Sequence, residues 1–464
     1  MKNKEYNLSF LLRISMVSAM GGLLFGYDFV VIGGAKPFYE RFFEITSSAN
    51  LQAWAMSSAL IGCIFGAVVS GFFSDKYGRK KTLLGCAFLF IVTSLGTGIA
   101  GSFSVFIMFR MLGGIGIGLA SAISPMYIAE VTPSHLRGRF VSLNQMTIVI
   151  GILLAQIVNM LIAEKVPAGA SDQFIAASWN GQTGWRWMFW ACGVPAVLFF
   201  LFTFFIPESP RWLFKVGKSY IAFPVLEKIG GKLYAQQETE NIKASFDDTS
   251  EKVNFKALLN RLYLPILIMG VVLAVFQQWC GINTVFNYAE EIFAAAGYGV
   301  SDTLFNIVIT GSVNLIFTFV AMFTVDKWGR KKLMLFGSAG LALSYLLLGS
   351  AFFFQLKGVA VLALVVSAIA IFAMSLGPIV WVILSEIFPN RIRGAAMALA
   401  TFSLWTACFV LTYTFPLLNK SLGAAGTFWV YSGICLLGFI FIIIKLPETK
   451  GKSLEEIEKS LLKR

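Results

Sequence analysis

Long apolar runs are the feature of this sequence that most constrains its fold. Each run has about the 20 residues that an α-helix needs to cross a bilayer. Backbone polar groups inside hydrocarbon must be satisfied within the segment itself, so such runs are stable there as helices. The sequence therefore predicts an all-α membrane protein with twelve transmembrane helices. The predicted spans cover residues 10–33, 53–74, 82–100, 103–127, 140–163, 186–206, 264–289, 303–325, 333–354, 358–385, 395–418 and 427–446.

The composition supports a lipid-facing surface. Charged residues make up 13% of the chain, and its mean hydropathy is +0.76. Soluble domains carry about 25% charged residues. A protein this apolar has too few polar side chains to cover a surface in water, so most of the chain is expected to face lipid or other helices.

The distribution of basic residues predicts the orientation. If the N-terminus is cytoplasmic, 30 of the 37 Lys and Arg residues fall on the cytoplasmic side. Cytoplasmic loops carry such an excess in membrane proteins. The net charge of +13 is then a topology signal and a contact for anionic lipid, with no need for nucleic acid. We expect both termini in the cytoplasm. Short outer loops, with no glycosylation motif in 34–52, favour a bacterial cytoplasmic membrane.

Two motifs recur at nearly one offset. Asp75–Arg79 (DKYGR) returns 251 residues later as Asp326–Arg330 (DKWGR), and Glu130–Arg137 (EVTPSHLR) returns 256 residues later as Glu386–Arg393 (EIFPNRIR). Each pair is six spans apart on one membrane side. This is typical of two parallel repeats with the solute path between them. The expected domains are a six-helix half at 1–206, a cytoplasmic linker at 207–262, a second six-helix half at 263–446 and a cytoplasmic tail at 447–464.

Five further motifs carry a family resemblance. They are Gly21–Asp28 (GGLLFGYD), Arg110–Gly118 (RMLGGIGIG), Pro207–Leu213 (PESPRWL), Gln277–Asn283 (QQWCGIN) and Pro447–Gly451 (PETKG). With the repeated loops, the chain resembles the sugar porter family of the major facilitator superfamily, in particular its bacterial proton–xylose and proton–glucose symporters. The resemblance implies the major facilitator fold and import of a monosaccharide with a proton by alternating access. A passive sugar uniporter and, less so, a sugar sensor are the alternatives.

Asp28 and Arg110 are the candidate proton-coupling residues. They are the only ionisable residues that fall well inside the predicted spans. Asp28 lies about 27 Å along its span, and Arg110 roughly 10 Å from the outer end of its own, so their depths are similar. Separating them would change how tightly the carboxylate holds a proton. The alternative is a static ion pair. Some proton-coupled relatives have a second buried Glu where this chain has Cys192, which leaves Asp28 as the sole proton carrier.

Amide side chains are the candidate sugar ligands, because an amide both donates to and accepts from a hydroxyl. We expect Gln278 and Asn283 to point inward with Gln277 beside them. The alternative is that these amides only bond helix to helix. Three positions, Ile152, Asn287 and Leu404, depart from the pattern of xylose carriers, so the identity of the transported sugar is left open. By resemblance, the sugar-contacting positions are Gln145, Gln277, Gln278, Asn283, Asn314 and Trp381.

Charged residues near the repeated loops form a candidate inner gate. Carboxylates and arginines recur there in matched pairs, and in the family they resemble a salt-bridge latch that breaks on opening. The alternative is solvated loop charge. The gating candidates are Asp75, Arg79, Glu130, Arg137, Glu208, Arg211, Asp326, Arg330, Glu386 and Arg393.

Catalytic and metal sites are not indicated by the side-chain inventory. The one histidine, His135, falls in a charged loop, and no set of nucleophile and base was found. We therefore expect no enzymatic activity, cofactor or metal. The predicted partners are a small sugar, a proton and membrane lipid, and the protein is expected to be a monomer.

Overall fold

The computed structural model describes residues 6–167, 169–247, 260–389, 392–450 and 456, and regular structure within these ranges is helical. The first six predicted spans form α1–α5, α7 and α8, and α9 and α10 follow. These elements are α1 (Leu8–Phe42), α2 (Ala49–Tyr77), α3 (Arg79–Ile99), α4 (Phe103–Val131), α5 (Arg137–Ile162), α6 (Asp172–Ala177), the π-helix η1 (Asn180–Gly184), α7 (Trp185–Ala191), α8 (Gly193–Thr203), α9 (Pro210–Lys215) and α10 (Ser219–Asp247).

The second part of the chain repeats the long helices. Its elements are α12 (Leu264–Trp279), α13 (Ile282–Asn287), α14 (Ala289–Ala295), α15 (Val300–Trp328), α16 (Arg330–Phe353), α17 (Val359–Met374), α18 (Leu376–Ile387) and α19 (Arg393–Lys445). Within the described residues, eleven helices are long and apolar enough to cross a membrane. The last of them bends at Gly423, whose φ is 67°, and contains both the eleventh and the twelfth predicted span.

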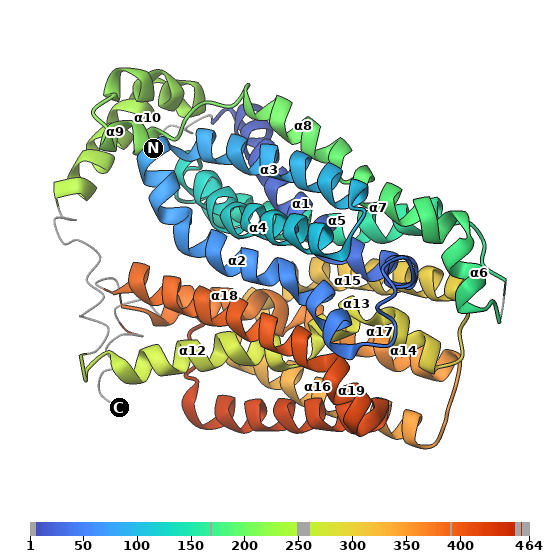
Figure 1. The fold of residues 1–464 in the computed structure, drawn as a ribbon. Helices are drawn as coiled ribbons and strands as arrows, with labels where there is room; N and C mark the ends of the chain where they lie inside the picture. Colours follow the sequence, from blue (N-terminus) through green and yellow to red (C-terminus); the bar gives the residue numbers. More distant parts are fainter. Residues whose placement is uncertain (1–5, 168, 248–259, 390–391, 451–455, 457–464) are drawn as a thin grey trace.

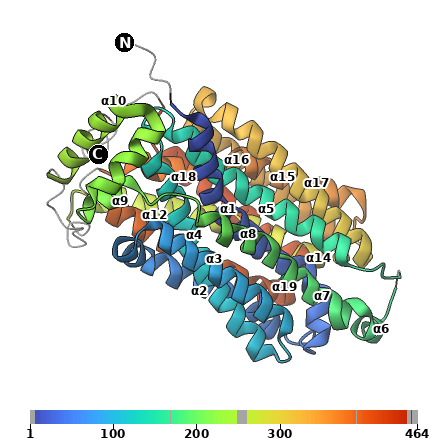
Figure 2. The ribbon, with the colours of Figure 1, turned by 90° about the horizontal axis from the view of Figure 1, so that it is seen from above.

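The helices pack as two bundles (Figure 1). In the N-terminal bundle, α1–α8, helix α2 packs on α4 and α1 on α5. In the C-terminal bundle, α12–α19, helix α16 packs on α19 and α15 on α17. The bundles meet where α2 contacts α19 and α5 contacts α15. Figure 2 shows the same two groups from above, with α5 beside α15.

Glycine allows the closest helix contacts in the N-terminal bundle. A Cβ added at Gly114 would lie 1.8 Å from the Ala59 carbonyl oxygen, and one at Gly62 would lie 2.0 Å from that of Met111. Small residues let backbones approach in this way in membrane helices, where burial of apolar surface does not drive association. Gly114 and Gly118 of span four, the second of which would place a Cβ 2.3 Å from the Cys63 carbonyl oxygen, therefore serve helix packing.

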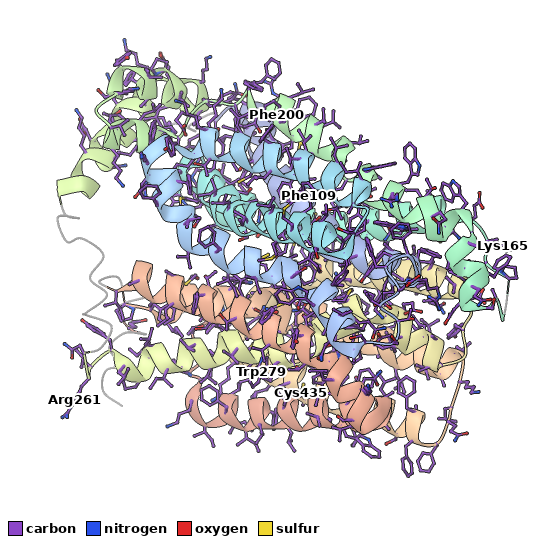
Figure 3. All side chains as sticks on the ribbon, viewed as in Figure 1. Phe109, Lys165, Phe200, Arg261, Trp279 and Cys435 are labelled. Carbon is purple, nitrogen blue, oxygen red and sulfur yellow. The ribbon has the colours of Figure 1, made fainter. Side chains whose placement is uncertain are left out.

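Large apolar side chains cover the sides of both bundles. Phe72, Phe323 and Leu437 expose 62%, 72% and 68% of their surface. Exposed apolar surface on so many helices would be unfavourable in water and is favourable in contact with lipid chains. Figure 3 shows side chains projecting from the bundles along their whole length, between Arg261 at one end and Lys165 at the other.

The two ends of the molecule differ. Helices α9 and α10 lie at one end, here named the linker end, and α6 and α14 lie toward the opposite end (Figure 1). The start of α1 is also at the linker end, because the Asn7 N–H donates to the Ile229 carbonyl of α10 at 2.9 Å. The Tyr6 and Tyr234 rings contact each other there, with their centroids 5.4 Å apart.

Candidate functional site

Asp28 and Arg110 form a buried ion pair between α1 and α4. The Arg110 Nη1 donates to both Asp28 carboxylate oxygens at 3.0 Å, and the two side chains are 9% and 3% exposed. Both terminal nitrogens of Arg110 also lie 3.4 Å from the Asp28 backbone carbonyl oxygen. The Arg110 Nε is buried without a partner among the described residues. A single nitrogen thus holds the carboxylate, rather than the two-nitrogen fork of the strongest Arg–carboxylate pairs.

The surroundings of this pair are mostly apolar. The Arg110 guanidinium lies 5.7 Å from the Phe189 ring centroid. Cys192, fully buried, is close enough to both charges to interact with them electrostatically. A Cβ added at Gly113 would lie 3.7 Å from the Asp28 Oδ2. The predicted pairing of Asp28 with Arg110 is therefore present in the structure, and a cysteine stands beside it.

Gln277 lies on α12 and links two spans that are each interrupted. The seventh span breaks between α12 and α13 at Gly281, whose φ is 88°, and the tenth breaks between α17 and α18 at Ser375. The Gln277 Nε2 donates to the Leu376 and Gly377 carbonyls at 3.2 and 2.8 Å. Its Oε1 is buried without a partner among the described residues. The nitrogen end of the amide thus donates to the first turn of α18, and its oxygen is left to accept a hydrogen bond.

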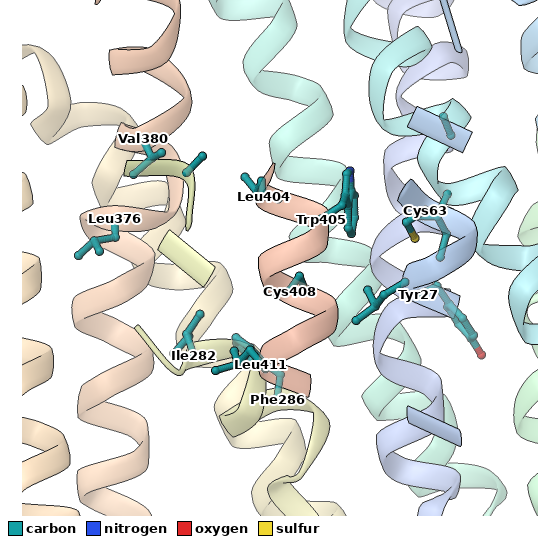
Figure 4. Packing of buried hydrophobic residues seen from close by; sticks show 14 of the residues in the cluster. Tyr27, Cys63, Ile282, Phe286, Leu376, Val380, Leu404, Trp405, Cys408 and Leu411 are labelled. Atoms are coloured by element: carbon teal, nitrogen blue, oxygen red, sulfur yellow. The ribbon is translucent and has the colours of Figure 1, made fainter. Parts of the chain in front are cut away.

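Gln278 and Asn283 are bonded to each other across the same break. The Asn283 Nδ2 donates to the Gln278 Oε1 and lies 3.4 Å from the Cys408 sulfur of α19. Both side chains are half-buried. In Figure 4, Leu404, Trp405 and Cys408 of α19 lie between α13 and α18 on one side and Tyr27 and Cys63 of the N-terminal bundle on the other. The amides therefore lie near the contact between the bundles.

Aromatic rings meet at the same contact. The centroids of Phe25 on α1 and Trp405 on α19 are 5.6 Å apart. Asn287, at the end of α13, is buried and its Oδ1 has no partner among the described residues. Leu404 is buried and Ile152 is half-buried. Two departures from the pattern of xylose carriers, Ile152 and Leu404, are therefore apolar, and the third, Asn287, has an amide oxygen without a partner among the described residues.

The remaining predicted sugar ligands come from other helices. Gln145 is half-buried on α5, and Asn314 is buried on α15, the helix that packs against α5. Trp381 on α18 is 37% exposed. No hydrogen bond joins these three to Gln277, Gln278 or Asn283 within the described part of the chain. Of the predicted sugar ligands, Gln278 and Asn283 are thus the two that the structure joins directly.

Charged gating candidates of the first repeat form one network at the linker end. The Arg79 fork donates to both Glu130 oxygens, at 2.9 and 2.8 Å, and Ser209 donates to the same carboxylate. Glu208 accepts from the backbone N–H groups of Arg79 and Lys80, so it caps the start of α3. Burial raises the pKa of the Glu208 carboxyl, while these N–H donors oppose the rise. Asp75 lies 3.3 Å from Arg79.

The second repeat reproduces this network nearly group for group. Arg330 donates to Glu386 at 3.1 Å, and Thr449 donates to the same carboxylate at 2.6 Å. Glu448 accepts from the backbone N–H groups of Arg330 and Lys331 and caps the start of α16. The residue directly before each of these two helices is a glycine with positive φ: 93° at Gly78 before α3 and 88° at Gly329 before α16. The two loops therefore have the same local structure, in which the repeated arginine and glutamate residues make the same contacts.

Each network stays within its own bundle in this structure. Arg137 donates to the Ala129 carbonyl at 3.0 Å and pairs with no described carboxylate. Arg211, half-buried, likewise has no carboxylate partner in the described ranges. The side chains of Asp326 and Arg393 lie outside the described residues. The networks therefore stabilise the loops locally here, and none of their described ion pairs joins the two bundles.

A second buried charge cluster was missed by sequence reasoning. Lys36 and Glu40, predicted to lie in a loop, lie on α1, which continues to Phe42. They are 1% and 5% exposed, so buried charge on α1 extends beyond the predicted end of span one at residue 33. Glu290 and Glu291 at the start of α14 complete the cluster. The four-residue spacing of Lys36 and Glu40, which puts them on one helix face, was the available signal.

Comparisons with known proteins agree with this architecture. Residues 14–461 match the family model described as "Sugar (and other) transporter". The chain is 39% identical to the D-xylose-proton symporter of Escherichia coli (strain K12), covering 98% of this chain and 96% of that protein. It is 38% identical to the arabinose-proton symporter of Bacillus subtilis (strain 168), covering 99% and 97%.

A solved structure matches as well. The partially occluded inward open conformation of the xylose transporter XylE from E. coli superposes with a TM-score of 0.84 at 38% identity, covering 96% of this chain and 100% of that one. These matches confirm the predicted family, the twelve-helix fold and a transport protein rather than an enzyme. The chain therefore belongs to the sugar transporter family of the major facilitator superfamily, whose members are multi-pass membrane transporters.

Proposed function

We propose that this protein imports a monosaccharide resembling xylose or glucose together with a proton, by alternating access. The observation that carries the proposal is the buried ion pair of Asp28 and Arg110 in the N-terminal bundle. Relatives named as proton symporters of D-xylose and arabinose support both the sugar class and the coupling.

The geometry of the pair fits a proton switch. When Asp28 takes a proton, it loses its charge attraction to Arg110, which still has the Asp28 backbone carbonyl as an acceptor. Only one Arg110 nitrogen has to release the carboxylate. Each proton that moves inward through 100 mV contributes about 2.3 kcal/mol, enough to concentrate a sugar more than tenfold.

The sugar site is proposed to lie at the span-seven break. The Gln277 Oε1 and Asn287 Oδ1, which have no partner in the described part of the chain, are available to accept from sugar hydroxyls. Gln278 and Asn283, bonded to each other in this structure, would exchange that bond for hydroxyl contacts. Trp405 and Phe25 supply aromatic surface beside them. The other ligands proposed are Gln145, Asn314 and Trp381.

Transport by two bundles requires them to move relative to each other. The proposed moving domains are residues 1–206 and 263–446, with 207–262 as linker and 447–464 as tail. The linker end is assigned to the cytoplasm of a bacterial cell, and the protein is proposed to act as a monomer in contact with membrane lipid. The gating residues at the linker end would pair across the bundles when that end closes.

Uptake into proteoliposomes tests the function. Purified protein is supplied with labelled xylose, glucose, arabinose and galactose, with and without a proton gradient. Accumulation above the outside concentration, abolished when the gradient is collapsed, is expected for at least one sugar. Equilibration without accumulation would identify a passive uniporter, and no uptake of any sugar would reject the proposal.

The topology is tested by reporter fusions. Fusions at residue 240, in α10, and at the C-terminus are expected to report the cytoplasm, because basic loops are retained there. A fusion near residue 170 should report the outside. An outside signal at residue 240 would contradict the two-domain arrangement.

The inner gate is tested by neutralising Arg137 and Glu386. If these residues bridge the bundles when the linker end closes, Arg137→Ala and Glu386→Gln should favour the conformation open at that end. Reactivity of a cysteine introduced at Gln278 toward a cytoplasmic reagent should rise several-fold. Glu386 also holds Arg330 here, so the Arg137 variant is the cleaner test.

An exposed residue of the same end provides the control. Lys232→Ala removes a charge from exposed α10 surface and should leave reactivity unchanged. Unchanged reactivity in both gate variants would reduce Arg137 and Glu386 to local contacts of the kind described here.

A further inference from the structure

Lys36 connects carboxylates of both bundles at the end opposite the linker. Its ammonium bonds to the Glu291 Oε1 and lies 3.7 Å from the Glu290 Oε2, both on α14 of the C-terminal bundle. On its own helix it lies 3.4 Å from the Glu40 Oε1. The side chain is 2% exposed, and its ammonium lies 5.7 Å from the Tyr288 ring centroid. This lysine is thus enclosed by three carboxylates and an aromatic ring.

Lys36 has a position that no other charge shares in the described ranges. Every described ion pair that links the N-terminal to the C-terminal bundle is made by this side chain. Arg41, five residues further along the same helix, pairs instead with Asp172 of its own bundle at 2.7 Å. The pairs of Arg79 and Arg330 at the linker end also stay within one bundle. Among the ion pairs of the described residues, those that join the bundles therefore lie at the end opposite the linker.

The backbone is closely packed around the cluster. A Cβ added at Gly33, one turn before Lys36, would lie 3.2 Å from the Asn287 carbonyl oxygen on α13. At the same end the Val166 N–H donates to the Ser301 hydroxyl across the bundles at 3.0 Å. The opposite end is thus held closed by contacts around α1, α13 and α14.

Removing the Lys36 ammonium would change the electrostatic interaction between the bundles at this end from attraction to repulsion. Glu40 on one bundle would then face Glu290 and Glu291 on the other, close enough to interact electrostatically. Like charges at such distances repel strongly where water is scarce. Breaking a buried ion pair from one side also leaves an uncompensated charge. The same cluster therefore favours closure with Lys36 and opening without it.

We propose that Lys36 is the residue that locks the outer gate: it holds the end opposite the linker closed, and it must leave Glu290 and Glu291 before sugar enters from that side. This inference rests on the proposed alternating access of the two bundles. Lys36 acts on the conformational equilibrium rather than on the sugar or the proton.

Spin-label distances test the lock directly, without a substrate. Labels are placed on cysteines at Gln173 and Lys420, exposed residues of the two bundles, in a chain whose six buried native cysteines are replaced. Lys36→Met keeps the apolar stem and removes the charge. The ratio of outer-open to outer-closed distances is expected to rise at least tenfold relative to the unmodified protein.

Two further variants separate the lock from a general loss of packing. Arg41→Met removes a basic residue from the same helix and end but from a pair within one bundle, so the ratio should not change. Lys36→Glu combined with Glu291→Lys restores a cross-bundle pair and should return the ratio toward the original.

The outcomes distinguish this inference from the proposed function. An unchanged ratio in Lys36→Met, in a protein whose unmodified form transports sugar, would overturn the lock alone. An equal rise in Arg41→Met, or no recovery in the swapped pair, would also overturn it. Failure of the unmodified protein to transport any sugar would instead reject the proposed function, whatever the distances show.

Discussion

An Asp28→Asn variant is expected to exchange sugar across the membrane yet fail to concentrate it. Asparagine keeps the size and hydrogen bonding of the side chain but cannot bind and release a proton. Arg110 would lose its carboxylate partner while retaining the backbone carbonyl of residue 28. Because the sugar amides lie on other helices, sugar binding should remain. Proton-driven accumulation should fall from many-fold to none, while counterflow persists.

Accumulation and counterflow are measured side by side in proteoliposomes. Asp172→Asn is the matched control, since it neutralises a carboxylate that is 71% exposed and lies outside the proposed site. Arg110→Ala should also impair uphill transport, because Asp28 would then hold its proton without a neighbouring cation. Concentration of sugar by Asp28→Asn at the level of the unmodified protein would show that this residue does not couple the proton.

The Asp28–Arg110 pair was predictable from sequence because two facts about the membrane coincide. Charged residues are rare inside spans, so each one there needs a partner or water. Helix rise converts position in a span into depth, which placed the two residues at the same level. The structure pairs them at 3.0 Å. Inventory and depth were sufficient without knowledge of packing angles.

The Lys36 cluster was not predicted, because Lys36 and Glu40 lie beyond the apolar run that marks the first span. The apolar run of span one ends near residue 33, but α1 continues to Phe42, and Lys36 on this extension pairs with carboxylates of the other bundle. Helix ends are then set by tertiary contacts rather than by hydropathy. Glu290 and Glu291 are distant in sequence, and nothing local marks them as partners of Lys36.

The contacts of the repeated loops could be predicted only in part from the sequence. The recurrence of Arg79 and Arg330 predicted two equivalent sites, and the structure contains both. The caps formed by Glu208 and Glu448 depend on the chain returning to the start of α3 and α16. Such a return is a property of the whole bundle, so sequence spacing does not encode it.

The orientation of the span-seven amides also depended on backbone breaks. Gln278 and Asn283 were expected to point inward, and they bond to each other. Gln277, expected beside them, donates to carbonyls at the break between α17 and α18. The two residues that supply these carbonyls begin α18, so Gln277 contacts the first turn after the break. The positions of the breaks at Gly281 and Ser375 therefore determined what each amide can contact.

Alanine substitution of Gln278 or Asn283 is expected to weaken sugar binding about tenfold or more. Each change removes a partner for a sugar hydroxyl, and a buried polar group left unpaired costs about 1–3 kcal/mol. Gln277→Ala should have a larger effect on folding, because its amide also links α12 to the start of α18 through the Leu376 and Gly377 carbonyls. Binding is measured on purified protein by calorimetry, with expression and thermal unfolding recorded for every variant.

Asn241→Ala is the matched control, since it removes an exposed amide of α10 that bonds only to Glu238 among the described residues. Its affinity for sugar should equal that of the unmodified protein. A fall in affinity for Gln278→Ala and Asn283→Ala with unchanged thermal unfolding would locate the sugar at the break between α12 and α13. Unmodified affinity in both would mean that their mutual hydrogen bond only links α12 to α13 and that the sugar binds elsewhere.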